Sequence, residues 1–146
     1  MYRKDFIKVC GMVCLSGTAL STLLQSCASS NYFAATTVAN NKVGIKKTEF
    51  IAEADNKSIA RKFVLVKIPQ YNFPIGVYKI SEEQYSAVLM ECTHKGCELR
   101  TQGTYLVCPC HGSEFSNTGI VQNPPAEENL KTFQITHDHD NIYIQL

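Results

Sequence analysis

The chain contains no tryptophan, and its net charge is only +1, from 14 basic and 13 acidic residues. A nucleic-acid-binding protein needs a concentrated basic face, which so balanced a composition does not supply. The 146 residues also contain no glycine-rich nucleotide-binding fingerprint and no internal repeat. These absences argue against nucleic acid as a partner and against nucleotide chemistry. The length fits one domain plus a tail.

A hydrophobic run long enough to cross a bilayer is also lacking. The uncharged stretch Val9–Leu24 has sixteen residues, whereas a transmembrane helix needs about twenty. It follows a basic head and precedes Leu24-Gln25-Ser26-Cys27, which is similar to a bacterial lipobox whose cysteine is acylated after cleavage. We therefore expect residues 1–27 to be an export signal, with a lipid on Cys27 holding the protein at the periplasmic side of a bacterial membrane. Ordinary signal cleavage and an uncleaved anchor are the alternatives.

The basic head carries the run Arg3-Lys4-Asp5-Phe6-Ile7-Lys8. It is similar to a twin-arginine export signal with lysine in the second arginine position. That route exports proteins that have already folded, which suits a cofactor inserted in the cytoplasm. Residues 28–41 are small and polar and carry no charge, so we expect a flexible linker there. The folded domain is then expected over residues 42–146.

Within that domain, short β-branched and apolar runs predict strands and no segment shows a long stripe with helical period. The predicted strands lie near Val43–Phe50, Phe63–Ile68, Ile75–Ile80, Tyr85–Met90, Thr132–Thr136 and Ile142–Leu146. The last two alternate with period two, and the turn His137–Asn141 joins them as a hairpin. We expect its two histidines to be solvated turn residues. The fold class is therefore all-β, a small antiparallel sandwich or barrel.

Four of the seven cysteines and two of the four histidines lie in one stretch, Glu91–Ser116, as two clusters. The first is Cys92-x-His94-x-x-Cys97, and the second is Cys108-x-Cys110-His111. The ten residues between them, Glu98–Val107, suffice for a short hairpin that brings the clusters face to face. Six such donors at one point indicate a metal site.

Two metal sites compete on chemistry alone. A structural zinc ion would take four donors in a closed tetrahedron and leave two unused, giving a zinc-stabilised binding module. A [2Fe-2S] cluster would take Cys92 and Cys108 on one iron and His94 and His111 on the other. Cys97 and Cys110 then remain, one in each loop, and can form a disulfide in an oxidising compartment. Only this assignment, with its additional disulfide, gives all six donors a use, which favours the cluster.

At these residues the sequence resembles the Rieske iron–sulfur proteins. The segments Cys92-Thr93-His94-Lys95-Gly96-Cys97 and Cys108-Pro109-Cys110-His111-Gly112-Ser113 match the C-T-H-x-G-C and C-P-C-H-G-S motifs of the high-potential branch. That branch occurs in cytochrome bc and b6f complexes. The resemblance implies a Rieske-type β sandwich or barrel whose two cluster-binding loops form a subdomain, with one [2Fe-2S] cluster per chain.

The resemblance also gives roles to neighbouring residues. Gly96 and Gly112 would permit tight turns, and Ser113 would donate a hydrogen bond to a cluster sulfide. The Pro124-Pro125 segment is similar to the loop that covers one side of the cluster. Two positions depart from the pattern: Lys95 stands where a leucine usually covers the cluster, and Phe115 where a tyrosine often bonds a ligand sulfur. The segment between the two motifs is also shorter than usual.

The function implied is one-electron transfer by an exported, membrane-tethered carrier. Histidine ligands leave the cluster less negative than four thiolates would, so Rieske centres have potentials of roughly −150 to +300 mV. The redox partner implied is a cytochrome or a respiratory quinol-oxidising complex. The alternatives are the Rieske small subunit of a periplasmic oxidoreductase of the arsenite-oxidase type, and a ferredoxin of an oxygenase. We expect the chain to be an electron-transfer component and not a catalyst by itself.

Overall fold

The computed structural model describes residues 32–54 and 57–146, and nearly all regular structure in them is β-strand. The predicted export signal, Cys27 and the first four linker residues lie outside this range. An all-β fold is confirmed, with every ladder between named strands antiparallel in the part described. No helix in the described ranges is long and apolar enough to cross a membrane.

Thirteen strands and one short 3-10 helix follow one another along the described chain. The first six elements are β1 (Thr36–Ala39), β2 (Lys42–Lys46), η1 (Lys47–Phe50), β3 (Ile51–Ala54), β4 (Lys57–Ala60) and β5 (Phe63–Val66). The next four are β6 (Ile75–Lys79), β7 (Tyr85–Leu89), β8 (Arg100–Gln102) and β9 (Tyr105–Val107). The last four are β10 (Glu114–Ser116), β11 (Val121–Asn123), β12 (Ile135–His137) and β13 (Asn141–Gln145).

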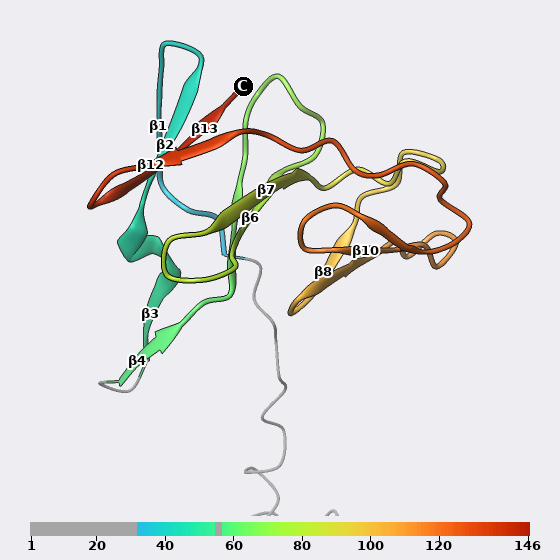
Figure 1. Ribbon diagram of the computed structural model, residues 1–146, viewed down its shortest axis with the longest axis horizontal. Coiled ribbons are helices and arrows are strands. Elements are labelled where there is room, and N and C mark those ends of the chain that lie inside the picture. The colour runs from blue at the N-terminus through green and yellow to red at the C-terminus, as the bar shows by residue number, and fades with distance from the viewer. Residues whose placement is uncertain (1–31, 55–56) are drawn as a thin grey trace, which may run out of the picture. The chain divides into compact units, whose positions relative to one another are not determined.

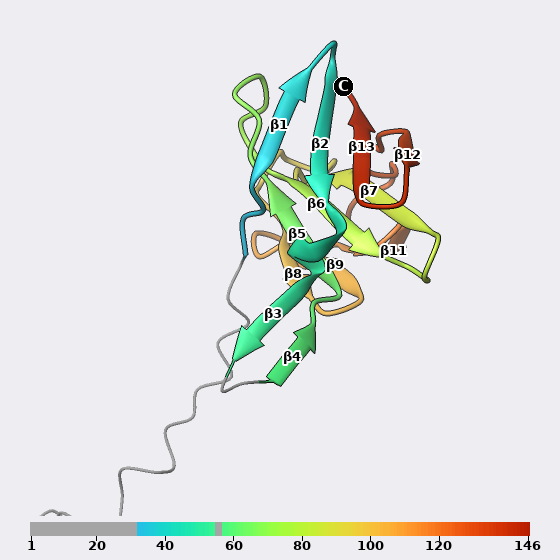
Figure 2. The same ribbon diagram turned by 90° about the vertical axis from the view of Figure 1, so that its left-hand side faces the viewer.

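Two sheets form the base of the domain, with strand orders β1-β2-β13-β12 and β5-β6-β7 (Figures 1 and 2). Alternate residues of their strands meet in one core, because successive side chains of a strand point to opposite faces. That core consists of Val43, Ile45, Phe50, Val64, Val66, Ile68, Ile75, Val77, Ala87, Leu89, Ile142 and Ile144. The strongly alternating pattern of β2 and β13 follows from this one-sided burial.

The sheet β5-β6-β7 is buried on both of its faces. One face packs into the base core, whereas Leu65, Tyr78 and Val88 on the other face join a second core that contains Cys92 and Cys108. Strands covered on both sides need apolar residues at every position. This explains why Phe63–Val66 is continuously apolar and why β6 alternates poorly.

A separate four-stranded sheet, order β11-β10-β9-β8, carries the two loops with the cysteine and histidine clusters and lies to the right of the base in Figure 1. Strand β7 runs from the base directly into the first loop, and the N–H of Leu99 then bonds to the carbonyl of Met90. The predicted hairpin between the two donor clusters is confirmed as β8 and β9. A cluster-binding subdomain therefore stands on the second face of the β5-β6-β7 sheet.

The described part of the predicted linker is not a linker. Strand β1 pairs with β2 from Thr36↔Ile45 to Ala39↔Lys42. The backbone of Ala34 also bonds to Leu65 in the base sheet. The polar composition was misleading because β1 is an edge strand whose side chains lie mostly in solvent. The folded domain therefore already includes described residues before residue 42, from Ala34 onward.

Two other features test the strand predictions. The segment that follows Phe50 forms the exposed hairpin β3–β4, which projects from the other strands in Figure 2. The sequence analysis did not predict this hairpin. The C-terminal hairpin is confirmed as β12 and β13, with Asp138 accepting hydrogen bonds from the N–H groups of Asp140 and Asn141 in its turn.

Candidate metal centre

The two donor-bearing loops have the same backbone hydrogen bonds. In the first loop (residues 92–97), the N–H of Cys92 donates to the carbonyl of Cys97, and the N–H of Gly96 donates to the carbonyl of Cys92. In the second loop (residues 108–113), Cys108 donates to Ser113 and receives a bond from Gly112 at the same offsets. The loops are therefore two copies of one turn, each beginning at a cysteine.

Glycine is required in each turn by its backbone angle. Gly96 has φ +69° and Gly112 has φ +81°, in the left-handed region that side chains disfavour. A Cβ atom at Gly112 would meet nothing within 4 Å, so space is not the constraint. The predicted tight turns are confirmed. The N–H groups of both glycines donate to cysteine carbonyls and not to sulfur.

The thiols that begin the loops are buried, with Cys92 2% and Cys108 1% exposed, and neither forms a disulfide. Burial raises the pKa of the Cys92 thiol, and its hydrogen bond with Cys108 raises it further. The backbone N–H groups of His94 and Lys95 donate to the Cys92 sulfur and act in the opposite direction. Two adjacent buried thiols, of which Cys92 already receives two N–H donors, suit thiolate ligation of a metal.

The rings of the two histidines, one from each cluster, lie next to each other. The ring centroids of His94 and His111 are 4.9 Å apart, and the rings stand nearly perpendicular, at 85°. The Nδ1 atom of His94 is buried and has no hydrogen-bond partner among the described residues. A buried ring nitrogen without a partner is costly unless it binds something. The His111 residue is exposed, so this end of the site reaches the surface.

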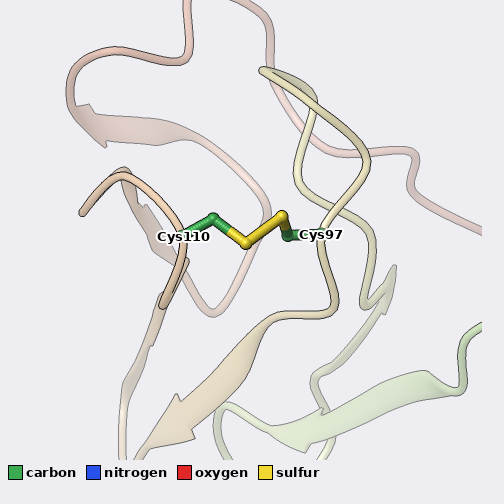
Figure 3. The surroundings of a disulfide bond; sticks show 2 residues. All are labelled: Cys97 and Cys110. Carbon is green, nitrogen blue, oxygen red and sulfur yellow. A yellow bond between two sulfur atoms is a disulfide. The ribbon is translucent and has the colours of Figure 1, made fainter.

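Cys97 and Cys110 form the disulfide that was predicted for them, with an S–S distance of 2.08 Å. The bond joins the first loop to the second (Figure 3). Cys97 is half-buried and Cys110 is exposed. Of the six donors in the two clusters, the disulfide takes two, so one thiol and one imidazole remain in each loop.

A third segment, the covering loop (residues 123–130), contacts both donor loops. The hydroxyl of Ser113, fully buried, accepts a bond from the N–H of Ala126 at 3.0 Å. The hydroxyl of Thr93 donates to the carbonyl of Glu128 at 2.7 Å. These two bonds hold the covering loop, which contains Pro124-Pro125, against the donor loops. The sequence analysis missed the contribution of Thr93, which no spacing signal marks.

Apolar side chains close the inner side of the site. Phe115 is fully buried in β10, and Leu106 in β9 and Leu99 belong to the same core as the two thiols. They exclude water from the side that faces the base. The outer side of the site is open to solvent, because Lys95 and His111 are both exposed there. Lys95 therefore places a positive charge in solvent beside the donors.

The fold and the site define a metalloprotein of one class: an all-β protein whose two equivalent loops offer two thiols and two imidazoles from opposite sides. A [2Fe-2S] cluster with two ligands from each loop fits the buried thiols and the unpartnered His94 nitrogen. These four donors, taken alone, also suit a tetrahedral zinc ion. The donor set therefore does not distinguish the two metal centres.

Comparison with known proteins decides between them. The Rieske [2Fe-2S] domain family matches residues 45–134. The chain therefore belongs to the Rieske family, whose domain binds a [2Fe-2S] cluster, and it performs Rieske-type electron transfer. The competing zinc assignment is accordingly set aside.

Individual relatives agree with this assignment. The cytochrome b6-f complex iron-sulfur subunit of Synechococcus sp. is 28% identical over 156 aligned positions, covering 99% of this chain and 84% of the relative. The ubiquinol-cytochrome c reductase iron-sulfur subunit of Bradyrhizobium diazoefficiens is 33% identical over 89 positions, covering 58% of this chain and 51% of that subunit. The crystal structure of the plasma membrane Rieske protein PetC3 of Synechocystis superposes with a TM-score of 0.52 and 33% identity, covering 58% of this chain and 87% of that one. The similarity to the high-potential branch is thus confirmed.

Proposed function

We propose that this protein is an exported one-electron carrier, tethered to the membrane, that serves a respiratory quinol-oxidising complex. Its cluster ligands are Cys92, His94, Cys108 and His111. The observations that support the proposal are the adjacent rings of His94 and His111, the hydrogen bond between the buried thiols of Cys92 and Cys108, and the exposure of His111. The relatives that are subunits of b6-f and ubiquinol-cytochrome c reductase complexes support the choice of partner.

Each part of the site has a definite task in this function. When bound, the cluster supplies a centre that accepts and returns one electron. Cys92 and Cys108 would hold it from the buried side, and the N–H groups of His94 and Lys95 would stabilise negative charge on the Cys92 sulfur. The disulfide fixes the distance between the loops. His111, an exposed residue, would offer an electron a route to a docked partner.

The residue Phe115 provides a test of the surroundings of the cluster. Phe115→Tyr places a hydroxyl in the core shared with Cys92, where it can donate to the sulfur and favour the reduced, more negative state. A hydrogen bond to a charged acceptor contributes about 1.5–3 kcal/mol, of which about 1 kcal/mol should differ between redox states, on the order of 40 mV for one electron. We expect the midpoint potential to rise by that amount in protein film voltammetry.

The matched change in the second donor loop is Ser113→Ala. The Ser113 oxygen already accepts from Ala126, so its hydroxyl hydrogen is free to donate to a sulfide. Removing it is expected to lower the potential and also to leave the Ala126 N–H without its partner, at a cost of about 1–3 kcal/mol in stability. A midpoint that neither substitution moves, with the cluster intact, would show that these side chains do not face the sulfurs.

The membrane tether depends on Cys27, which lies outside the described residues. If Cys27 carries a lipid, Cys27→Ala is expected to accumulate as an unprocessed precursor or to leave the membrane fraction. Metabolic labelling with a palmitate analogue checks this, with Cys10→Ala as the matched control that retains the label. Absence of label in the unaltered protein would replace the lipid anchor with ordinary cleavage or a retained helix.

A further inference from the structure

The free thiol of Cys108 lies beside the disulfide. The sulfur atoms of Cys97, Cys108 and Cys110 all lie within 4.8 Å of one another. Two of these sulfurs are already bonded, and Cys108 is the free, buried member of the group. A cysteine sulfur so close to a disulfide can attack it as the thiolate, since thiol–disulfide exchange proceeds by attack of a thiolate on an accessible disulfide sulfur.

We propose that in chains without a cluster Cys108 exchanges with the disulfide, forming a Cys97–Cys108 bond and releasing the Cys110 thiol. The Cys97–Cys110 bond breaks as the new bond forms, and one proton passes from the Cys108 sulfur to the Cys110 sulfur. Among the four cysteines of the two loops, one disulfide and two free thiols are present before and after. The step therefore requires no oxidant and no reductant.

The choice between the two disulfide sulfurs follows from the positions of their residues. Attack on Cys110 would close a small ring across Pro109 alone, whose φ angle is fixed by its own ring. Attack on Cys97 keeps the first and second loops joined, as the original bond does. It also releases the sulfur of Cys110, which is already an exposed residue, so no buried group has to reach solvent.

The exchange has a consequence for how the protein matures. This consequence rests on the proposed function, because it requires that iron bind the Cys108 sulfur. Iron on that sulfur prevents the attack, whereas an exchanged chain has lost one of its two thiolate ligands. The cluster must therefore enter before the exchange takes place. A chain that reaches an oxidising compartment without a cluster is trapped in a form that cannot accept one.

The test follows the location of free thiols in the full-length chain. Serine replaces Cys10, Cys14 and Cys27, so that only the four cysteines of the two loops remain. Iron is removed from the loaded protein by a chelator without oxygen, and released sulfide is removed by gel filtration. Samples taken over time are alkylated with N-ethylmaleimide, and each labelled cysteine is identified by mass spectrometry of peptides. We expect label to disappear from Cys108 and to appear on Cys110, while Cys92 stays labelled.

Three matched samples make the result decisive. The Cys108→Ser chain is expected to label at Cys92 alone, and the Cys92→Ser chain to label finally at Cys110 alone. The loaded protein is expected to label at none of the four cysteines. After exchange, iron and sulfide added to the chain should no longer restore the visible absorption of the cluster, whereas chains captured at the start should recover it.

Two outcomes would overturn the proposal. One is a cluster-free chain in which Cys92 and Cys108 stay labelled and Cys110 never is. The other is a Cys92–Cys108 disulfide formed beside an intact Cys97–Cys110 bond. Failure of the proposed function is a separate result, because it would appear as a purified protein without iron. The cluster-free samples would still test the exchange, which depends only on the sulfur positions.

Discussion

Replacing His94 or His111 by cysteine is expected to lower the midpoint potential more than any other single change in the site. Each substitution exchanges a neutral imidazole for an anionic thiolate, so adding an electron becomes less favourable. Rieske centres lie at roughly −150 to +300 mV and plant-type ferredoxins with four cysteines near −400 mV, so one exchange should shift the potential by on the order of 200 mV. Protein film voltammetry of the variants measures this directly.

The C-terminal hairpin supplies a matched control for the same chemical change. His139 lies in its turn with a side chain 97% exposed, outside the two donor loops. His139→Cys is expected to leave the potential where it is. The ligand assignment would be wrong if either loop variant kept its cluster and showed an unchanged or higher midpoint. Iron analysis of every variant separates a shifted potential from a lost cluster.

Gly119→Ala is expected to destabilise the fold by about 3 kcal/mol, because two penalties act together. Gly119 has φ +87°, a conformation that side chains disfavour. An added Cβ atom would also lie 3.2 Å from Thr132 and 3.3 Å from both Leu130 and Val88. These neighbours come from the covering loop, the chain after it and the base sheet. The substitution should therefore loosen the contact between the base and the cluster-binding subdomain.

Another glycine separates the two penalties. Gly103, in the turn between β8 and β9, has φ +71°, but a Cβ atom there would meet nothing within 4 Å. Gly103→Ala is therefore expected to cost only the backbone strain, about 1 kcal/mol. Urea unfolding of the loaded proteins, followed by the visible absorption of the cluster and by circular dichroism, compares the two. Equal losses of stability would mean that crowding at Gly119 is relieved by small movements of its neighbours.

The side-chain hydrogen bonds around the site show that part of its environment depends on residues far away in the sequence. The hydroxyl of Ser113 accepts a hydrogen bond from the N–H of Ala126, and the hydroxyl of Thr93 donates one to the carbonyl of Glu128. Neither pair is marked by a motif, because each joins a donor loop to a segment that arrives only when the chain folds back. Predictions about potential that use the first loop alone would miss both contacts.

The sequence by itself determined the chemistry of this protein. The spacing of the cysteines and histidines defined two donor clusters, each with two cysteines and one histidine. Such motifs are short because each donor loop is a local turn. Period-two alternation also predicted the C-terminal hairpin with β13, and apolar residues predicted the early strand β2, although its last predicted residues, Lys47–Phe50, form a 3-10 helix. Local patterns are sufficient where burial is one-sided and where the required geometry lies within a few residues.

Only the tertiary structure decided where the domain begins and what surrounds the cluster loops. Strand β1 has a linker-like composition, and it becomes a strand because the edge of β2 is available to pair with it. The irregular pattern of β6 has its cause in a second core on the far face of its sheet, which only assembly creates. The same assembly brings the sulfur of Cys108 within 4.8 Å of those of Cys97 and Cys110. Distances between separate loops depend on long-range packing, and no local pattern in a sequence records them.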